Sequence, residues 1–390
     1  MARLCILLRP LITLSLLHFP VHAAKVKQSS DLHMALKHSG GNHAELEVAL
    51  RAIPGRDTEY LLRHASQYDL VNLTSQQIIE NVTYARKVHV ALPYLGKKID
   101  DELWREWVLP QRVLDEDLDL WRKDFYEQMQ PLLKGKQTVR EVVDAAHAWL
   151  MEGTTATGAA QIAFGNSEDR CKSPQQMRRI GKGSCGELSM MFVYVLRAVG
   201  IPARHCQMSW RYYGESLHYY CEYWDAQLPQ WVPLDASDEK PIKPSISPQQ
   251  RTQTEGLGVL AFYAHRGFPE VRDSYHAAGL DRCLPVTENM LETYQVEFGT
   301  PAGFAGTATV HVWNSDAWRA VARGTAGTLP GRRMELADAR ATAGRPVLFT
   351  ATDGKTLLWA MQVPAAQTGK VELIQAVPGQ CLSWADFGKP

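Results

Sequence analysis

The sequence has no net charge and, beyond its N-terminal segment, no long apolar run. Lysine plus arginine and aspartate plus glutamate each number 42 among 390 residues. Without an overall basic field, we do not expect a nucleic acid as the main partner. No stretch after residue 23 approaches the ~18 uninterrupted apolar residues of a transmembrane helix. We therefore expect no stable membrane span once an N-terminal signal is removed.

Metal-binding spacings and repeats are also missing. The cysteines form no C-x-x-C pair and no aspartate-rich calcium loop is visible, so we expect no metal and no cofactor. The sequence contains no internal repeat and no low-complexity tract. Its composition, 45% hydrophobic and 22% charged, is typical of a globular protein with two or three domains.

The first 23 residues have the pattern of a secretory signal peptide. Arg3 and Arg9 supply a positive start, residues 10–19 are apolar, and small residues at 21–23 suit a cleavage site. We expect cleavage after residue 23 and export to a periplasmic or extracellular compartment. The alternative is an uncleaved anchor, but the apolar run is too short to span a bilayer comfortably.

An exported chain meets an oxidising compartment, where disulfides are permitted. Removal of the signal leaves six cysteines, at positions 171, 185, 206, 221, 283 and 381. If one of them stays free as a nucleophile, an odd number remains, and at least one other cysteine is unpaired.

The rest of the chain divides into a helical, a mixed and a strand-rich part. Periodicity predicts helices over 69–88, 100–128, 139–150 and 257–278, with a loop over 153–182. Short β-like runs at 293–298, 307–313, 318–321, 346–350, 356–363 and 370–374 predict a small antiparallel sandwich. We expect an α+β protein with a signal peptide (1–23), a helical N-terminal region (24–140), a central core (141–285) and a C-terminal β-sandwich-like domain (290–390).

The most informative single residue is Cys185, at the start of an amphipathic helix. Apolar residues from Leu188 to Val199 recur at helical spacing and predict one largely buried stripe. Gly200 suits the C-terminal cap, and Pro202 prevents the helix from continuing. Cys185 therefore falls in the first turn, where free N–H groups and the helix dipole stabilise a thiolate or a developing oxyanion.

Two predicted hairpins follow this helix, with strands over residues 203–210, 217–224 and 230–235. Suppose that Trp224 pairs with Trp231 across the second turn. Tyr220 then lies opposite Asp235, and His218 lies one diagonal step away on the same face. A Cys-His-Asp set of this kind is typical of a thiol nucleophile, its base and the group that orients the base.

The register of the first hairpin leads to a further hypothesis. If Trp210 pairs with Leu217, Cys206 lies directly opposite Cys221, on the face away from His218. A disulfide between these two cysteines is one reading, and two buried thiols is the other.

Several sequence blocks carry a family signature: Gly183-Ser184-Cys185-Gly186-Glu187, the run from Leu196 to Arg204, His218, and Trp231-Val232-Pro233-Leu234-Asp235. Over roughly residues 140–240 the chain resembles the transglutaminase-like superfamily of papain-type thiol enzymes. The resemblance implies a cysteine helix packed on an antiparallel sheet. It also implies that Cys185 is the nucleophile, His218 the general base and acid, and Asp235 the orienting carboxylate.

The chain departs from the family pattern near the cysteine and the histidine. Tyr220 stands where the family often has tryptophan, and Ser184 and Gly186 flank the cysteine where cross-linking transglutaminases carry Gln and Trp. The Cys-Gly-Glu block is also similar to the peptide N-glycanase branch. For the oxyanion, Gln175 or Gln176 in the preceding loop is a candidate, against a simple solvent-facing role.

These features predict a cysteine-dependent hydrolase or acyltransferase of the protease or amidase type. Its substrates would be peptides, proteins or glycopeptides, attacked at a peptide, isopeptide or side-chain amide through a thioester, with hydrolysis favoured. The alternatives are an amine-transferring cross-linker and a non-catalytic binding protein with the same fold. Neither the substrate nor the oligomeric state follows from the sequence.

Overall fold

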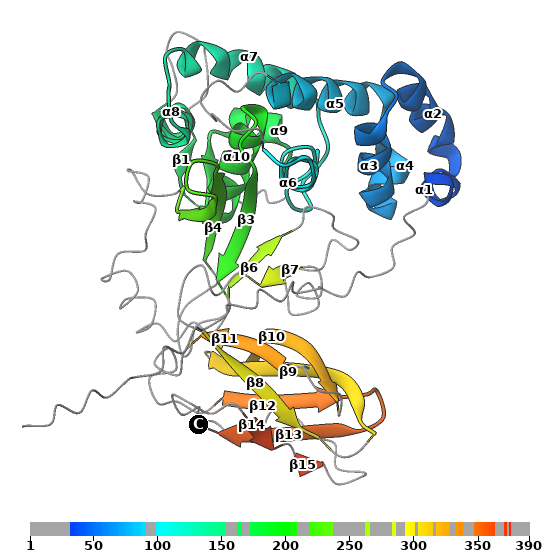
Figure 1. The fold of residues 1–390 in the computed structure, drawn as a ribbon, viewed down its shortest axis with the longest axis vertical. Helices are drawn as coiled ribbons and strands as arrows, with labels where there is room; N and C mark the ends of the chain where they lie inside the picture. Colours follow the sequence, from blue (N-terminus) through cyan, green and yellow to red (C-terminus); the bar gives the residue numbers. More distant parts are fainter. Residues whose placement is uncertain are drawn as a thin grey trace, which may run out of the picture.

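A computed structural model describes most of the chain from residue 32 to residue 375 (Figure 1). The described segments are 32–90, 99–152, 162–165, 172–208, 218–236, 262–265, 283–285, 293–300, 303–314, 317–327, 333–337, 347–362, 370–372 and 374–375. The predicted signal peptide lies outside them. Among the described residues, no helix has the length and apolar character needed to cross a membrane.

The N-terminal part is helical, as the sequence predicts. Side-chain caps define some of the boundaries: Asp100 accepts the backbone N–H of Glu102 at 2.8 Å, and Ser66 accepts that of Asp69 at 3.0 Å. The helices are α1 (Leu32–His38), η1 (Gly40–Asn42), α2 (His43–Ala52), α3 (Arg56–His64), α4 (Gln67–Asn72), α5 (Ser75–Val90), α6 (Asp101–Trp107), α7 (Arg122–Leu133) and α8 (Val139–Glu152).

Two predicted helices are interrupted in the structure. The run 69–88 breaks between α4 and α5, because Thr74 starts a new helix by accepting the N–H of Gln77. The run 100–128 contains a non-helical segment from 108 to 121, between α6 and α7. Glu116 stabilises that segment by accepting the N–H groups of Val113 and Leu114. Its carboxylate is wholly buried, and helical periodicity carries no sign of such a tertiary contact.

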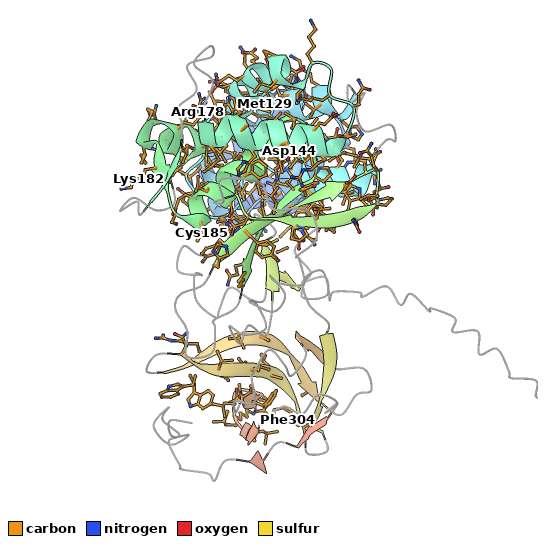
Figure 2. The ribbon with its side chains drawn as sticks, turned by 90° about the vertical axis from the view of Figure 1, so that its left-hand side faces the viewer. Met129, Asp144, Arg178, Lys182, Cys185 and Phe304 are labelled. Carbon is orange, nitrogen blue, oxygen red and sulfur yellow. The ribbon has the colours of Figure 1, made fainter. Side chains whose placement is uncertain are left out.

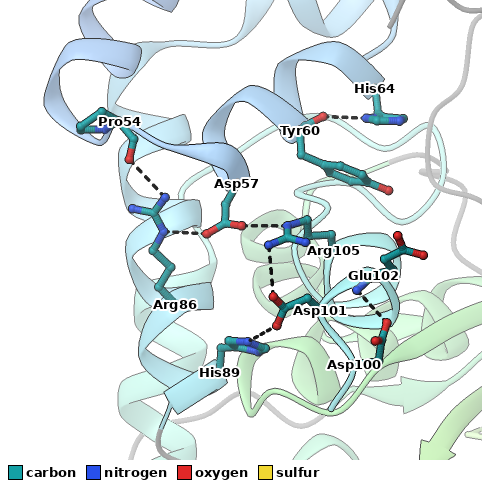
Figure 3. A network of polar contacts seen from close by, with 10 residues as sticks. All are labelled: Pro54, Asp57, Tyr60, His64, Arg86, His89, Asp100, Asp101, Glu102 and Arg105. Carbon is teal, nitrogen blue, oxygen red and sulfur yellow. Dashed lines mark hydrogen bonds and ion pairs between the residues drawn. The ribbon is translucent and has the colours of Figure 1, made fainter. Parts of the chain in front are cut away.

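A polar network joins α3, α5 and α6 (Figure 3). Asp57 on α3 accepts from Arg86 on α5 at 2.9 Å and from Arg105 on α6 at 3.0 Å. Asp101 on α6 lies 3.6 Å from Arg105 and 3.2 Å from His89. Because the Asp57 carboxylate is shared between Arg86 and Arg105, the network links α6 to α3 and α5.

The segment before Cys185, predicted as a loop over 153–182, contains regular structure. It includes β1 (Ala163–Phe164), α9 (Pro174–Ile180) and β2 (Lys182–Gly183). Ser173 and Gln176 form a capping box at the start of α9, and Gly181 ends it with a positive φ of 66°. The local cap signal is present in the sequence, but the Gly- and Ser-rich composition around it obscures it.

The central element of the fold is helix α10 (Cys185–Ala198), whose residues from Glu187 to Ala198 are all buried. It lies between α7 and α8 on one side and a five-stranded antiparallel sheet on the other (Figure 1). The strand order is β5-β4-β3-β6-β7, with β3 (Ala203–Met208), β4 (Tyr219–Asp225), β5 (Gln230–Leu234), β6 (Phe262–His265) and β7 (Cys283–Pro285). The predicted helix over 257–278 is wrong over 262–265, where β6 pairs with β3.

The C-terminal part is built from strands in two sheets, as predicted, but the pairing is not wholly antiparallel because β14 pairs with β8 in parallel. One sheet has the order β10-β9-β12-β13-β15 and the other β11-β8-β14. The strands are β8 (Thr293–Gly299), β9 (Ala305–Asn314), β10 (Ala317–Gly327), β11 (Arg333–Ala337), β12 (Val347–Thr352), β13 (Leu357–Gln362), β14 (Lys370–Glu372) and β15 (Ile374–Gln375). β11 was not predicted. Trp313 and Trp318 are buried and pack edge to face.

One continuous hydrophobic cluster extends from Ala35 in α1 to Ala236 after β5. It contains residues of the N-terminal helices, of α10 and of the inner face of the sheet. The predicted boundary at residue 140 therefore falls inside one shared core, and the division into domains stays a prediction. The chain as a whole is α+β, as expected.

Candidate active site

A cap formed by Ser184 and Glu187 positions the first turn of α10. The backbone N–H of Ser184 donates to Glu187 Oε2 at 2.8 Å, and the Ser184 hydroxyl donates to the same oxygen. The carboxylate lies close to the chain because Gly183 has no side chain. A Cβ built on Gly183 would lie 2.8 Å from the Glu187 Cβ. Gly183 and Glu187 together thus define where the helix starts and where Cys185 lies.

Cys185 is half-buried at the rim of the α10–sheet unit (Figure 2). Burial raises the pKa of its thiol, but hydrogen bonds with the His218 side chain and the Tyr219 N–H, together with the His218 charge, outweigh burial. The net result is a lowered pKa. A thiol in this setting is a better nucleophile at neutral pH, because more of it is present as thiolate.

His218 lies directly before β4, and Asp235 directly follows β5. Their side chains are 23% and 16% exposed, and His218 Nε2 lies 2.5 Å from Asp235 Oδ2. Burial lowers the pKa of the imidazole, but the hydrogen bonds and charges of Asp235 and Cys185 raise it to about 9. The two shifts run in the direction that favours a thiolate beside an imidazolium, and Asp235 contacts that imidazole through Nε2.

The structure brings together the three side chains that the sequence singled out. The register that placed them is the predicted one, because Trp224 pairs with Trp231 across the β4–β5 turn. Extending that register puts Tyr220 opposite Asp235, on the same strand face as His218.

The predicted register of the β3–β4 hairpin is wrong by one residue. Cys206 pairs with Tyr220, and Cys221 pairs with His205. A slip of one residue sends the two cysteines to opposite faces of the sheet, so the hypothesised Cys206–Cys221 disulfide does not form. Both are buried free thiols. Burial raises the pKa of both, which makes them inert compared with Cys185.

The two glutamines considered for an oxyanion lie in α9 and have structural partners. Gln175 Nε2 donates to Asp124 Oδ2 at 2.9 Å, and Gln176 Oε1 accepts the Ser173 N–H at 3.0 Å. Neither is a solvent-facing loop residue, and both amides serve to anchor α9. Asp124, the partner of Gln175, lies 51 residues away in sequence, so sequence reasoning had no signal for this contact.

Sequence reasoning also missed three groups beside Cys185: Glu187, Tyr219 and His205. The Ser184-x-x-Glu187 spacing is a capping-box pattern and could have identified Glu187. Nothing in the sequence indicated that the Tyr219 N–H reaches the thiol or that His205 contacts the first turn. Among the residues that the structure describes, no cluster of three or more His, Cys, Asp or Glu side chains could hold a metal ion.

Comparison with known proteins gives one family match. A model described as the transglutaminase-like superfamily matches residues 127–236. No curated protein matches the sequence.

Solved structures also match, at low similarity. A candidate cysteine protease from Cytophaga hutchinsonii has 14% identity and a TM-score of 0.28, covering 37% of this chain and 47% of that chain. The periplasmic domain of TgpA from Pseudomonas aeruginosa has 18% identity and a TM-score of 0.27, covering 36% and 50%. Red sea bream transglutaminase has 13% identity and a TM-score of 0.32, covering 75% and 67%. This chain spans about half the length of the first two, and TM-scores this low add no weight to the family match.

The family match and the resemblance read from the sequence fall on the same part of the chain. In that part a cysteine helix packs on an antiparallel sheet, as the resemblance implied. Over residues 127–236, this chain is therefore similar to the transglutaminase-like superfamily.

Proposed function

We propose that this protein is an exported thiol enzyme that cleaves amide bonds through Cys185, His218 and Asp235. The observation that carries the proposal is the His218–Asp235 contact of 2.5 Å beside a thiol of lowered pKa. Export is supported by the signal-like pattern of residues 1–23. N-terminal sequencing of the exported protein tests that part, since it would start at residue 24.

In the proposed reaction the Cys185 thiolate attacks the carbonyl carbon of an amide and forms a C–S bond. The imidazolium of His218 gives its proton to the leaving nitrogen as the C–N bond breaks, which leaves a thioester. Water then attacks the thioester, His218 takes a proton from it, and the C–S bond breaks to release a carboxylic acid and the thiolate. Asp235 orients the ring in both halves.

Hydrolysis is proposed over amine transfer because water is abundant for an exported enzyme and the cross-linking residues are absent beside the cysteine. Ser184 and Gly186 stand there instead, and Ser184 is used to cap the helix. A peptide, isopeptide or glycopeptide amide is the proposed substrate class. If product analysis showed an amine coupled to the acyl group in place of a free acid, the enzyme would be a transferase.

Cys185→Ala is the direct test. We expect it to abolish turnover of any amide that the wild type cleaves while leaving the unfolding transition unchanged, because the nucleophile supplies most of the rate. A screen of peptide, cell-wall and glycopeptide amides against both proteins provides the measurement. Equal activity in the two proteins would refute the proposal.

The other thiols supply an internal control that needs no substrate. A brief pulse of iodoacetamide at neutral pH should label Cys185 rapidly and leave Cys206 and Cys221 unlabelled, because burial keeps those two protonated and covered. Peptide mass spectrometry reads the three sites separately. Labelling of Cys185 no faster than an ordinary exposed thiol would count against an activated nucleophile.

A further inference from the structure

A buried histidine outside the three proposed catalytic residues contacts the first turn of the nucleophile helix. His205 lies in the middle of β3 and is fully buried. Its Nε2 lies 3.3 Å from the backbone carbonyl oxygen of Gly186, the residue that follows Cys185. Because a carbonyl oxygen only accepts, Nε2 must carry the proton in this contact.

The same ring also contacts the strand that carries the base. The rings of His205 and Tyr219 lie 5.2 Å apart at an interplanar angle of 36°. Tyr219 directly follows His218, and its backbone N–H is hydrogen-bonded to the Cys185 thiol. A Cβ built on Gly186 would lie 3.4 Å from the Tyr219 ring, so the helix backbone packs directly on that ring.

His205 thus links the helix to the sheet through two contacts. Its Nε2 contacts the Gly186 carbonyl of α10, and its ring contacts the Tyr219 ring of β4. Cys185 and His218 are the chain neighbours of Gly186 and Tyr219. Loss of either His205 contact would therefore alter the distances from the Cys185 thiol to the His218 imidazole and to the Tyr219 N–H.

We propose that His205 is a positioning residue, which holds the first turn of α10 at the distance from β4 that the Cys185–His218 pair requires. The inference rests on the proposed function and deepens it. His205 touches no reacting atom, so its effect is on the geometry and ionisation of Cys185. A misplacement of the reacting groups by a fraction of an ångström is enough to slow such chemistry by roughly tenfold or more.

The test compares His205→Met with His205→Gln in the full chain. Methionine fills similar volume without an N–H, whereas the glutamine amide reaches the position of Nε2 and can donate. The readout is the rate of Cys185 alkylation by iodoacetamide as a function of pH. We expect His205→Met to react roughly tenfold more slowly at pH ~7, with a raised midpoint, and His205→Gln to recover most of the rate.

Cys206→Ala is the matched control. Cys206 is the next residue on the same strand and equally buried, but it lies on the sheet face opposite to that of His205 and Tyr219, where it pairs with Tyr220. Cys206→Ala should lower the free energy of unfolding without changing the pH dependence of Cys185 alkylation. An unchanged profile in a folded His205→Met protein would overturn the inference.

Two further results keep the inference testable if His205→Met does not fold. Nitrogen NMR of the wild-type imidazole must show the Nε2–H tautomer, and the Nδ1–H tautomer would overturn the proposal. His205→Asn, whose shorter amide does not reach Gly186, must react more slowly than His205→Gln. Failure of the proposed function looks different, because wild-type Cys185 would then itself react as an ordinary thiol.

Discussion

The two ends of helix α10 use polar groups in opposite ways. At the N-terminal end, Cys185, His218 and Asp235 remain partly exposed, and their charges depend on one another. At the C-terminal end, Arg197 and Arg122 are completely buried and bind backbone carbonyl groups in place of carboxylates. Cys185 and His218 at the N-terminal end thus have shifted, mutually dependent pKa values, whereas the polar groups at the C-terminal end bind the backbone.

The buried end is a clamp on the non-helical segment between α6 and α7. Arg122 donates to the carbonyl groups of Val108 and Pro110, and to that of Arg197 on α10. Arg197 donates in turn to the carbonyl groups of Arg112 and Ala203. A guanidinium offers five N–H donors in a rigid fork, so each arginine pairs several backbone groups that regular structure leaves without partners. The N-terminal helices thereby hold the C-terminal end of α10.

The comparison predicts that changes at the N-terminal end alter chemistry and leave stability alone. Asp235→Asn should show the largest effect on rate. Asparagine keeps the size of the side chain but removes the charge that orients and stabilises the imidazolium, so we expect turnover to fall by roughly three to four orders of magnitude with residual activity. Steady-state kinetics on an amide substrate measures it.

The control for that change lies on the same hairpin. Asp225→Asn should be nearly silent, since the side chain only accepts turn N–H groups from Gln227 and Leu228, which asparagine also does. If Asp235→Asn turned over substrate as fast as Asp225→Asn, the orienting role would be wrong.

Substitutions at the C-terminal end of α10 should lower stability and leave the reactivity of Cys185 unchanged. Arg122→Met removes the donor of several buried carbonyl groups, and we expect the free energy of unfolding to fall by about 3 kcal/mol. The alkylation profile of Cys185 should stay as in the wild type below the unfolding transition. Chemical denaturation gives the first quantity and iodoacetamide labelling the second.

Arg51→Met is the matched control, because the Arg51 side chain is 67% exposed and pairs with Glu47 one helical turn earlier in α2. Its effect should stay within about 0.5 kcal/mol. Equal losses in the two variants would mean that the clamp contributes no stability.

A substitution in the cap of α10 should change the position of Cys185 without removing a charged group. Gly183→Ala places a Cβ 2.8 Å from the Glu187 Cβ, so the cap must shift. We expect Cys185 alkylation to slow by roughly tenfold, because the first turn moves away from its partners. Gly41→Ala is the control, since a Cβ there meets no atom within 4 Å and the residue has no positive φ. Unchanged labelling in Gly183→Ala would show that the cap does not position the thiol.

The pH profile of the wild-type protein tests the electrostatic coupling between Cys185 and His218 without any substitution. As pH rises, Cys185 loses its proton at a lowered pKa and activity should rise. His218, which must be protonated to release the amine, loses its proton at a pKa of about 9, and activity should fall there by half. The two apparent pKa values of this profile belong to the coupled Cys185–His218 pair and not to either residue alone. A profile of kcat/KM that falls near pH ~6.5, the ordinary range of histidine, would contradict the proposed pairing.

The two hairpins show what pattern reasoning can and cannot predict. The β4–β5 register was predicted correctly because a short turn separates Trp224 from Trp231, and the tryptophans pair across it with ring centroids 5.6 Å apart. The β3–β4 register was wrong by one residue. There the connection is long, and β3 is also paired with β6, which lies more than fifty residues later in the chain. Local alternation has no access to that second partner.

The helical part shows the same limit. Caps such as Asp100 and Ser66 act on residues two or three positions away, and the sequence displays them. The break of the 100–128 run depends on Glu116, whose carboxylate is also bound by the Tyr194 hydroxyl of α10. Their separation of 78 residues in sequence exceeds the reach of any periodicity argument.

The local sequence pattern was enough to predict the helix that begins at Cys185, the pairing of β4 with β5, and thus the approach of His218 to Asp235. All of these depend on interactions between near neighbours in the chain. Three other arrangements became visible only in the folded chain: the opposite faces of Cys206 and Cys221, the buried arginine clamp, and the contact of His205 with the first turn of α10. Those arrangements are set by strand partners and burial across large separations in sequence, where the free energy comes from contacts that local pattern does not encode.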